Sequence, residues 1–207
     1  MNTLQETVEL VDLGLGNLNS IATSLLRSGI GSRRLRPEMS PRSKILILPG
    51  IGNFDSGAKA LDSNNFRELI LKHIANDGAL IGVCLGMQLL GKSSEEGRGR
   101  GLGLLDYDTT LLGKEATRSA PVMGWRTPKI IRHGWLGLNP ESRYYFMHDY
   151  GVQDAPQGIV TMTHEVSGAP VASSVAQGKI IGFQFHPERS LKFGQEILAS
   201  AVRELSQ

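Results

Sequence analysis

The amino-acid sequence predicts an α/β fold with three layers, in which a mostly parallel central sheet lies between layers of helix and continues into an antiparallel extension. Two observations predict this arrangement. Short apolar runs alternate with helix-like segments in the first half of the chain, and from about Gly101 onward candidate strands follow one another with little helix between them. Strands that alternate with helices form βαβ units, which place the strands in parallel and the helices over the sheet.

The first half contains three units of strand, turn and helix. Each unit begins with an apolar run of strand length, passes through a glycine-containing segment and continues with apolar residues at helical spacing. The second unit carries a longer loop, over 49–53, after its strand. The predicted strands are 8–13, 44–48 and 79–83, and apolar residues within 18–26, 66–74 and 85–90 mark the helices that follow them.

The second half is predicted to hold the antiparallel extension and a closing helix. Turn residues separate its apolar runs, and helical spacing returns near the end of the chain. The candidate strands are 104–112, 143–150, 159–164, 171–175 and 180–185, and apolar residues within 193–205 carry the final helix. Residues 1–207 are expected to form a single domain, because no stretch has the composition of a linker and domains commonly contain about 150 residues.

The composition excludes several classes of protein. The chain has 22 basic and 20 acidic residues scattered along its length, which argues against a nucleic-acid partner. Its longest apolar runs are far shorter than the roughly 18 residues that cross a bilayer, and its N-terminus has no secretory-signal pattern. Because Cys84 is the one cysteine, an internal disulfide and a multi-cysteine zinc site are both impossible, and a cytoplasmic location is expected.

Cys84 has the sequence surroundings of a catalytic nucleophile. The segment Gly82-Val83-Cys84-Leu85-Gly86 lies between a predicted buried strand and a helix, which is the pattern of a nucleophile elbow with cysteine in place of serine. The flanking glycines relieve the crowding of such a tight turn. The N–H groups at the start of the helix favour a thiolate, and the N–H of Leu85 can stabilise a developing oxyanion. A buried, inert cysteine is the alternative interpretation.

His186 is the candidate base for this nucleophile. It ends an apolar strand in Phe185-His186-Pro187-Glu188, and Pro187 favours an extended conformation at His186. In an extended segment His186 and Glu188 point to the same side, with Cα atoms roughly 7 Å apart. The carboxylate can then orient the imidazole while the other ring nitrogen faces the thiol. A surface ion pair and a pair of metal ligands are the alternatives, although no further cluster nearby completes a metal site.

Other residues at the same sheet edge are candidates for binding a substrate. Gly50–Gly52 follows a buried strand, so a backbone N–H there can turn toward an oxyanion, although an ordinary turn also fits. Gln88 lies one helical turn beyond the cysteine on the same face. His148 and Tyr150 alternate on a strand and either wall a pocket or pack inside the core. Gly14-Leu15-Gly16 lacks the third glycine of a dinucleotide fingerprint, so no nucleotide cofactor is expected.

Taken together, Pro49–Gly52, Gly82–Gln88 and Gln184–Glu188 resemble the motifs of the class I glutamine amidotransferases, in the family's order. The resemblance implies the flavodoxin-like α/β fold of that class and a triad of Cys84, His186 and Glu188. Such a triad hydrolyses L-glutamine to glutamate and ammonia through a thioester, with no metal or organic cofactor. The resemblance also assigns Ile51 and Leu85, with Gly50 and Gly52, to the oxyanion hole, and Gln88, Glu96, His148, Asp149 and Tyr150 to substrate binding.

A finer resemblance exists within that class. The segments Asp12–Leu18, Pro49–Phe54, Pro121–Trp125 and Tyr145–His148 are similar to those of the glutaminase subunits of imidazole glycerol phosphate synthases. It implies a heterodimer with a (β/α)8 cyclase subunit. That subunit uses the ammonia to make imidazole glycerol phosphate and aminoimidazole carboxamide ribonucleotide in histidine biosynthesis.

The chain departs from the usual pattern of that subunit at positions that the resemblance places toward the partner, namely Val122, Arg126, Asp149 and Arg189. Three alternatives therefore stay open. The chain can be a paralogous glutaminase that feeds another synthase, such as one that forms an amidino sugar. It can be a stand-alone cysteine hydrolase, or a catalytically silent binding subunit. The intact triad argues against the last.

Overall fold

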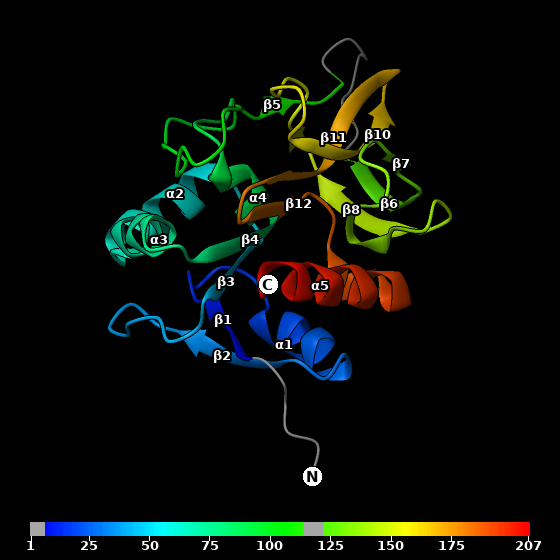
Figure 1. Ribbon diagram of the computed structural model, residues 1–207. Helices are drawn as coiled ribbons and strands as arrows, with labels where there is room; N and C mark the ends of the chain where they lie inside the picture. Colours follow the sequence, from blue (N-terminus) through cyan, green and yellow to red (C-terminus); the bar gives the residue numbers. More distant parts are fainter. Residues whose placement is uncertain (1–6, 114–121) are drawn as a thin grey trace.

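The computed structural model describes residues 7–113 and 122–207 (Figure 1). Their helices and strands alternate at first and then give way to a run of strands, as the sequence predicts. In chain order the elements are β1 Thr7–Val11, α1 Leu18–Arg27, β2 Gly31–Leu35, β3 Ile45–Gly50, α2 Phe54–Ser63, α3 Phe66–Ala75, β4 Ala79–Cys84, α4 Leu85–Leu90, β5 Thr110–Leu111, β6 Val122–Arg126, β7 Lys129–Ile130, the 3₁₀ turn η1 Trp135–Gly137, β8 Tyr144–His148, β9 Tyr150–Gly151, β10 Val160–Val166, β11 Ala169–Gln177, β12 Ile180–Phe183, the 3₁₀ turn η2 Pro187–Arg189 and α5 Leu191–Leu205.

In the described residues one eight-stranded sheet forms the centre of the molecule, with the strand order β2-β1-β3-β4-β12-β11-β10-β7. The strands from β2 to β12 pair in parallel, in the order typical of flavodoxin-like folds. The remaining pairs, from β12 through β11 and β10 to β7, are antiparallel. The predicted fold class, a mostly parallel sheet with an antiparallel extension, is confirmed.

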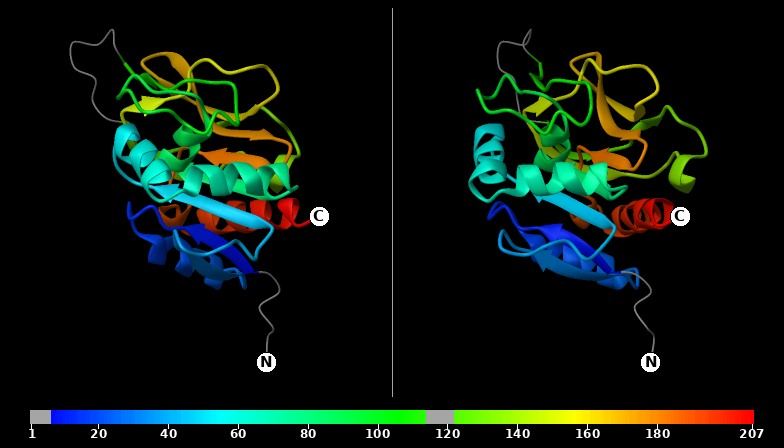
Figure 2. Two further views of the ribbon diagram at one scale, coloured as in Figure 1. Left: turned by 90° about the vertical axis from the view of Figure 1, so that its left-hand side faces the viewer. Right: turned by 60° about the vertical axis from the view of Figure 1, so that its left-hand side comes forward.

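Helices cover both faces of the parallel part, which gives the three layers (Figure 2). Strand β3 is buried along its whole length, as is expected for a central strand covered on both faces. Because side chains alternate along a strand, Ile45 and Ile47 join the core beneath α1 and α5, whereas Leu46 and Leu48 join the core beneath α2, α3 and α4. No helix within the described ranges is long and apolar enough to cross a membrane.

The topology brings three chain segments to one edge of the sheet. Strand β3 ends at Gly50, β4 ends at Cys84, and β12 ends at Phe183, shortly before His186. These strands are neighbours and run in parallel, so their carboxyl ends lie side by side. This edge is where open α/β sheets bind ligands.

The predicted strand at 104–112 is wrong for most of its length, because the structure has only the short β5, Thr110–Leu111, there. The apolar residues of this segment are buried without forming a ladder: Leu105 is 2% exposed and Tyr107 is also buried. The Tyr107 hydroxyl donates to the carbonyl oxygen of Met87, which anchors an irregular segment against α4. The pattern therefore reports burial correctly and secondary structure incorrectly.

Several elements of the structure lie outside the predicted set. Helix α2 follows the loop at 49–53 directly, with the Asn53 side chain accepting from the N–H of Ser56 at 2.8 Å as an N-cap. The edge strand β2 was missed because Ser32, Arg33 and Arg34 give it no apolar run. Strands β6 and β7 also lie outside the predicted set.

Candidate active site

Cys84 lies at the turn from β4 to α4 with φ +53° and ψ −110°, a backbone conformation that L-residues rarely adopt. The two flanking glycines make the turn sterically feasible. A Cβ on Gly82 would lie 2.7 Å from the backbone of Gly86, and a Cβ on Gly86 would overlap with the carbonyl oxygen of Leu48. The predicted elbow is thus present, and its glycines are required by close backbone approach.

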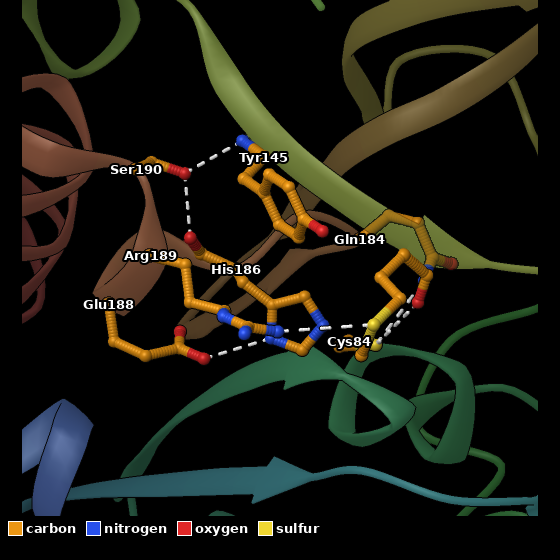
Figure 3. Close-up of polar contacts among 8 residues, drawn as sticks. Cys84, Tyr145, Gln184, His186, Glu188, Arg189 and Ser190 are labelled. Atoms are coloured by element: carbon orange, nitrogen blue, oxygen red, sulfur yellow. Dashed lines mark hydrogen bonds and ion pairs between the residues drawn. The ribbon is translucent and has the colours of Figure 1, made fainter. Parts of the chain in front are cut away.

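His186 and Glu188 form a hydrogen-bonded pair, with Nδ1 of the ring 2.9 Å from Oε1 of the carboxylate. The expected extended geometry is wrong beyond His186, because Pro187–Arg189 forms the 3₁₀ turn η2. The turn nevertheless brings the two side chains together. Ser190 anchors it by donating to the carbonyl oxygen of His186 at 2.6 Å and accepting from the N–H of Tyr145 at 2.9 Å. Figure 3 shows the imidazole between Glu188 and Cys84.

The electrostatics of His186 favour its charged form. Burial lowers the pKa of the ring, but the interactions with Cys84 and Glu188 outweigh burial and raise the pKa to about 10. An imidazolium at this position places a positive charge beside the cysteine sulfur. Such a charge stabilises a thiolate, which is the nucleophilic form of cysteine.

A cavity of about 220 Å³ lies against the sulfur and the imidazole. It brings together most of the residues that the sequence analysis predicted for the site. Its lining consists of Ile51, Gly52, Cys84, Gln88, Glu96, Met147, His148, Asp149, Tyr150 and His186. Three predicted residues lie outside that lining: Glu188 stands behind the imidazole, and Gly50 and Leu85 are buried in the sheet edge and the first turn of α4.

Gln184 is a site residue that the sequence analysis did not single out. It is fully buried and lies 4.0 Å from the Cys84 sulfur through its Nε2. Its Oε1 accepts from Nε2 of Gln88 at 3.4 Å, and the same Gln88 nitrogen donates to the carbonyl oxygen of Tyr150 at 2.9 Å. These contacts fix the Gln88 carboxamide in the cavity wall. The signal in the sequence was a polar side chain between the apolar residues Phe183 and Phe185.

Glu96 closes another part of the wall. Its Oε2 accepts from the backbone N–H of Phe54 at 2.7 Å, at the start of α2. Burial raises the pKa of Glu96, and the nearby carboxylates of Asp149 and Asp55 act in the same direction, while the bond from Phe54 opposes them. The carboxylate is thus held in place between a helix start and the cavity.

His148 faces the cavity as a neutral imidazole. Its Nδ1 donates to the carbonyl oxygen of Tyr150 at 2.8 Å, which leaves Nε2 as the acceptor nitrogen. Burial is the main effect that lowers the pKa of His148 to about 4. The ring therefore adds no charge near neutral pH, and His186 is the better-placed base. Within residues 7–113 and 122–207 no cluster of His, Cys, Asp and Glu has the composition of a metal site.

A cysteine on a strand-to-helix turn, beside an imidazole that is hydrogen-bonded to a carboxylate, is an arrangement suited to covalent hydrolysis of an amide bond. The comparisons with known proteins identify the family. The family model "Glutamine amidotransferase class-I" matches residues 9–205. The chain belongs to this family and is a glutamine-hydrolysing enzyme by that membership.

Curated relatives narrow the similarity further. The chain is 34% identical over 201 residues to "Imidazole glycerol phosphate synthase subunit HisH 2" of Pseudomonas aeruginosa, covering 94% of this chain and 98% of the relative. It is 32% identical to subunit HisH of Thermotoga maritima, covering 94% and 96%. A solved structure of a glutamine amidotransferase superposes with a TM-score of 0.77 at 20% identity, covering 97% of this chain and 99% of that one, and supports the fold.

Proposed function

We propose that this chain is the glutaminase subunit of an imidazole glycerol phosphate synthase. It hydrolyses L-glutamine and supplies the ammonia to a (β/α)8 cyclase subunit in histidine biosynthesis. The observation that carries the proposal is one cavity lined by a nucleophile on a strained elbow, a base held by a carboxylate, and fixed polar groups. The similarity to HisH subunits over nearly the whole chain supports the choice of synthase.

In the first step the Cys84 thiolate attacks the side-chain carbonyl carbon of glutamine. The C–S bond forms as the carbonyl oxygen takes up negative charge. The backbone N–H groups of Leu85, next to the nucleophile, and of Ile51, in the cavity wall, are the proposed donors to that oxyanion. His186 then gives its proton to the amide nitrogen, the C–N bond breaks, and ammonia leaves a thioester on Cys84.

In the second step water hydrolyses the thioester. His186, now neutral, takes a proton from the water as it attacks the acyl carbon. Collapse of the second tetrahedral intermediate releases glutamate and restores the thiolate beside the imidazolium. Glu188 keeps the ring in one orientation through both steps by its bond to Nδ1.

The fixed groups of the wall are the proposed recognition elements for the α-amino and α-carboxyl ends of glutamine. Gln88 is held by Tyr150 and Gln184, and Glu96 is held by Phe54, so both present their polar atoms without first having to be ordered. The carboxylates of Glu96 and Asp149 are the proposed partners of the α-ammonium group of glutamine.

The proposed docking face for the cyclase surrounds the cavity mouth. Met123 is 56% exposed and Trp125 is 40% exposed on strand β6, which pairs with β8 so that Met123 lies opposite the cavity residue Met147. Leu191, 70% exposed, follows the anchoring Ser190. Exposed apolar side chains beside a reaction site fit a partner that covers the exit of the ammonia. Pro121, which the resemblance also places there, lies outside the described residues.

The test measures ammonia release from glutamine by the purified chain, alone and with the (β/α)8 subunit from the same genome plus the nucleotide ligand of that subunit. We expect the chain alone to release ammonia slowly, and the cyclase subunit together with its nucleotide ligand to stimulate the release strongly. Full activity without a partner would overturn the subunit assignment in favour of an autonomous hydrolase. No ammonia in either assay would exclude this synthase as the partner.

A pair of matched variants tests the docking face. Leu191→Asp is expected to abolish stimulation while leaving the basal rate unchanged, since the residue is exposed at the start of α5 and does not line the cavity. Leu71→Asp places the same charge on α3, which lies on the other side of the sheet, and is expected to change neither rate. Equal effects of both variants would contradict the proposed face.

A further inference from the structure

A second cavity, of about 890 Å³, lies outside the catalytic one and shares no lining residue with it. It is bounded by the end of β6, by β7, by β10 and β11, and by the loop 152–158. Its volume falls within the range of roughly 300–1,000 Å³ that is usual for small-molecule sites. Trp125 and Ile131 form part of its apolar wall, and polar side chains form much of the remainder.

Two cations line this cavity without an ion pair in the described part of the chain. They are Arg126, whose Nε is buried and has no hydrogen-bond partner there, and Lys129, at the start of β7. The acidic side chain in the lining is Glu165, which is exposed. The charge around the cavity is therefore positive, and a buried guanidinium nitrogen without a partner is costly unless a ligand or water satisfies it.

His164 supplies a further group with an unused hydrogen bond. The residue is 5% exposed, its Nδ1 lies 2.9 Å from the Ser173 hydroxyl oxygen, and its buried Nε2 has no partner among the described residues. Burial is the main cause that lowers the pKa of His164 to about 3, so the ring is neutral near pH 7. A neutral imidazole between Ser173 and the cavity can donate or accept according to its tautomer.

We propose that this cavity is a binding site for a small organic phosphate that carries hydroxyl groups. Arg126 binds the phosphate through its planar guanidinium, Lys129 adds a point charge, and Nε2 of His164 completes the contacts to the phosphate oxygens. The side chains of Gln153, Gln157 and Glu165 are placed to bind hydroxyl groups. The site adjoins the catalytic cavity, because the His164 ring packs edge-on against His148 with 5.6 Å between centroids.

Calorimetric titration of the full chain with glycerol 3-phosphate tests the proposal. The expected result is saturable binding of one equivalent with a Kd below about 1 mM, unaffected by saturating glutamine. Glycerol, which lacks the phosphate, is expected not to bind. Absence of saturable binding, equal binding of glycerol, or displacement by glutamine would each overturn the proposal, the last because it would place the phosphate in the catalytic cavity.

Charge variants locate the binding. Lys129→Glu is expected to raise the Kd for glycerol 3-phosphate at least tenfold. Since Lys129 is exposed, the fold should tolerate the change. Lys192→Glu, at an 84% exposed position on α5, is the control and should leave the Kd unchanged. Arg126→Gln should weaken binding without lowering the melting temperature, because it removes a buried nitrogen that has no partner among the described residues. An unchanged Kd in Lys129→Glu, or an equal loss in Lys192→Glu, would overturn the site.

Discussion

Gly86 packs so closely against Leu48 that a side chain at position 86 would overlap with the Leu48 carbonyl oxygen. This contact joins the first turn of α4 to the neighbouring strand β3. It fixes the distance between the nucleophile, which precedes the helix, and the Gly50–Gly52 segment, which follows the strand. A residue without a Cβ is therefore part of the geometry of the site.

We expect Gly86→Ala to lower glutaminase turnover at least about tenfold and to destabilise the chain by roughly 1–3 kcal/mol, because backbone must move to admit the methyl group. Gly29→Ala is the matched control. Gly29 has a positive φ, which Gly86 does not, but it has open space where a Cβ would lie, so its cost should be limited to the strain of a left-handed alanine, about 1 kcal/mol. Turnover and urea midpoints measure both effects. A fully active Gly86→Ala enzyme would contradict the required contact.

Replacement of Cys84 by alanine should abolish ammonia release and leave the fold intact, because the thiolate forms the covalent intermediate. A glutamine analogue with an electrophilic warhead should add to the protein once. Since Cys84 is the one cysteine, a single mass increment reports on this side chain. Retained turnover in Cys84→Ala, or an unlabelled wild-type chain, would rule out the thioester route.

Removal of the Glu188 carboxylate should change both the turnover of glutamine and the pKa of His186. Glu188→Gln removes a carboxylate that helps to raise the pKa of His186 to about 10, so the ring should titrate at a lower pH, as NMR of the imidazole can measure. Turnover should fall by up to about 10⁴-fold, because the carboxylate no longer holds the imidazole in the correct tautomer and orientation. Glu204→Gln, an exposed substitution on α5, should change neither quantity. A normal rate in His186→Asn would shift the role of base to His148.

Gln184 is expected to act as a positioning residue. Gln184→Leu keeps the approximate volume but removes the acceptor for Gln88, so the Gln88 carboxamide loses one of its two described contacts. We expect KM for glutamine to rise more than kcat falls, since recognition is affected more than attack. Gln184→Glu restores the acceptor and should recover part of the affinity. A change confined to kcat would indicate that the residue acts on the nucleophile instead.

The sequence predicted those parts of the site that depend on local geometry. The elbow at Cys84 and the pairing of His186 with Glu188 each lie within five residues, where glycine placement and strand ends leave a recognisable pattern. The cavity wall depends on contacts between distant segments, such as Gln88 with Tyr150 and Gln184, which no local pattern reports. The segment 104–112 was predicted as a strand for the same reason. Its residues are apolar because they are buried against α4, and a local pattern cannot tell such burial from pairing in a sheet.

Acid should destabilise the chain through two buried histidines. Folding lowers the pKa of His148 to about 4 and that of His164 to about 3, mainly by burial, whereas an unfolded histidine titrates near 6.5. Below pH 6.5 the unfolded state therefore binds more protons than the folded state. The contribution of these two histidines to the free energy of unfolding is complete above that pH and is lost as pH falls toward 4 and 3. His186, with its raised pKa, is protonated in both states below about pH 5.5 and adds no slope there.

The expected free energy of unfolding falls by up to about 1.4 kcal/mol per pH unit for each buried histidine between pH 5.5 and 4. Urea unfolding at several pH values measures that slope. His164→Gln removes one titrating group and should reduce the slope by up to about 1.4 kcal/mol per pH unit, whatever it does to the stability at pH 7.5. His133→Gln, at an exposed position, should leave the slope unchanged. If the wild type and His164→Gln lose stability equally over this range, the acid sensitivity arises from groups other than this histidine pair.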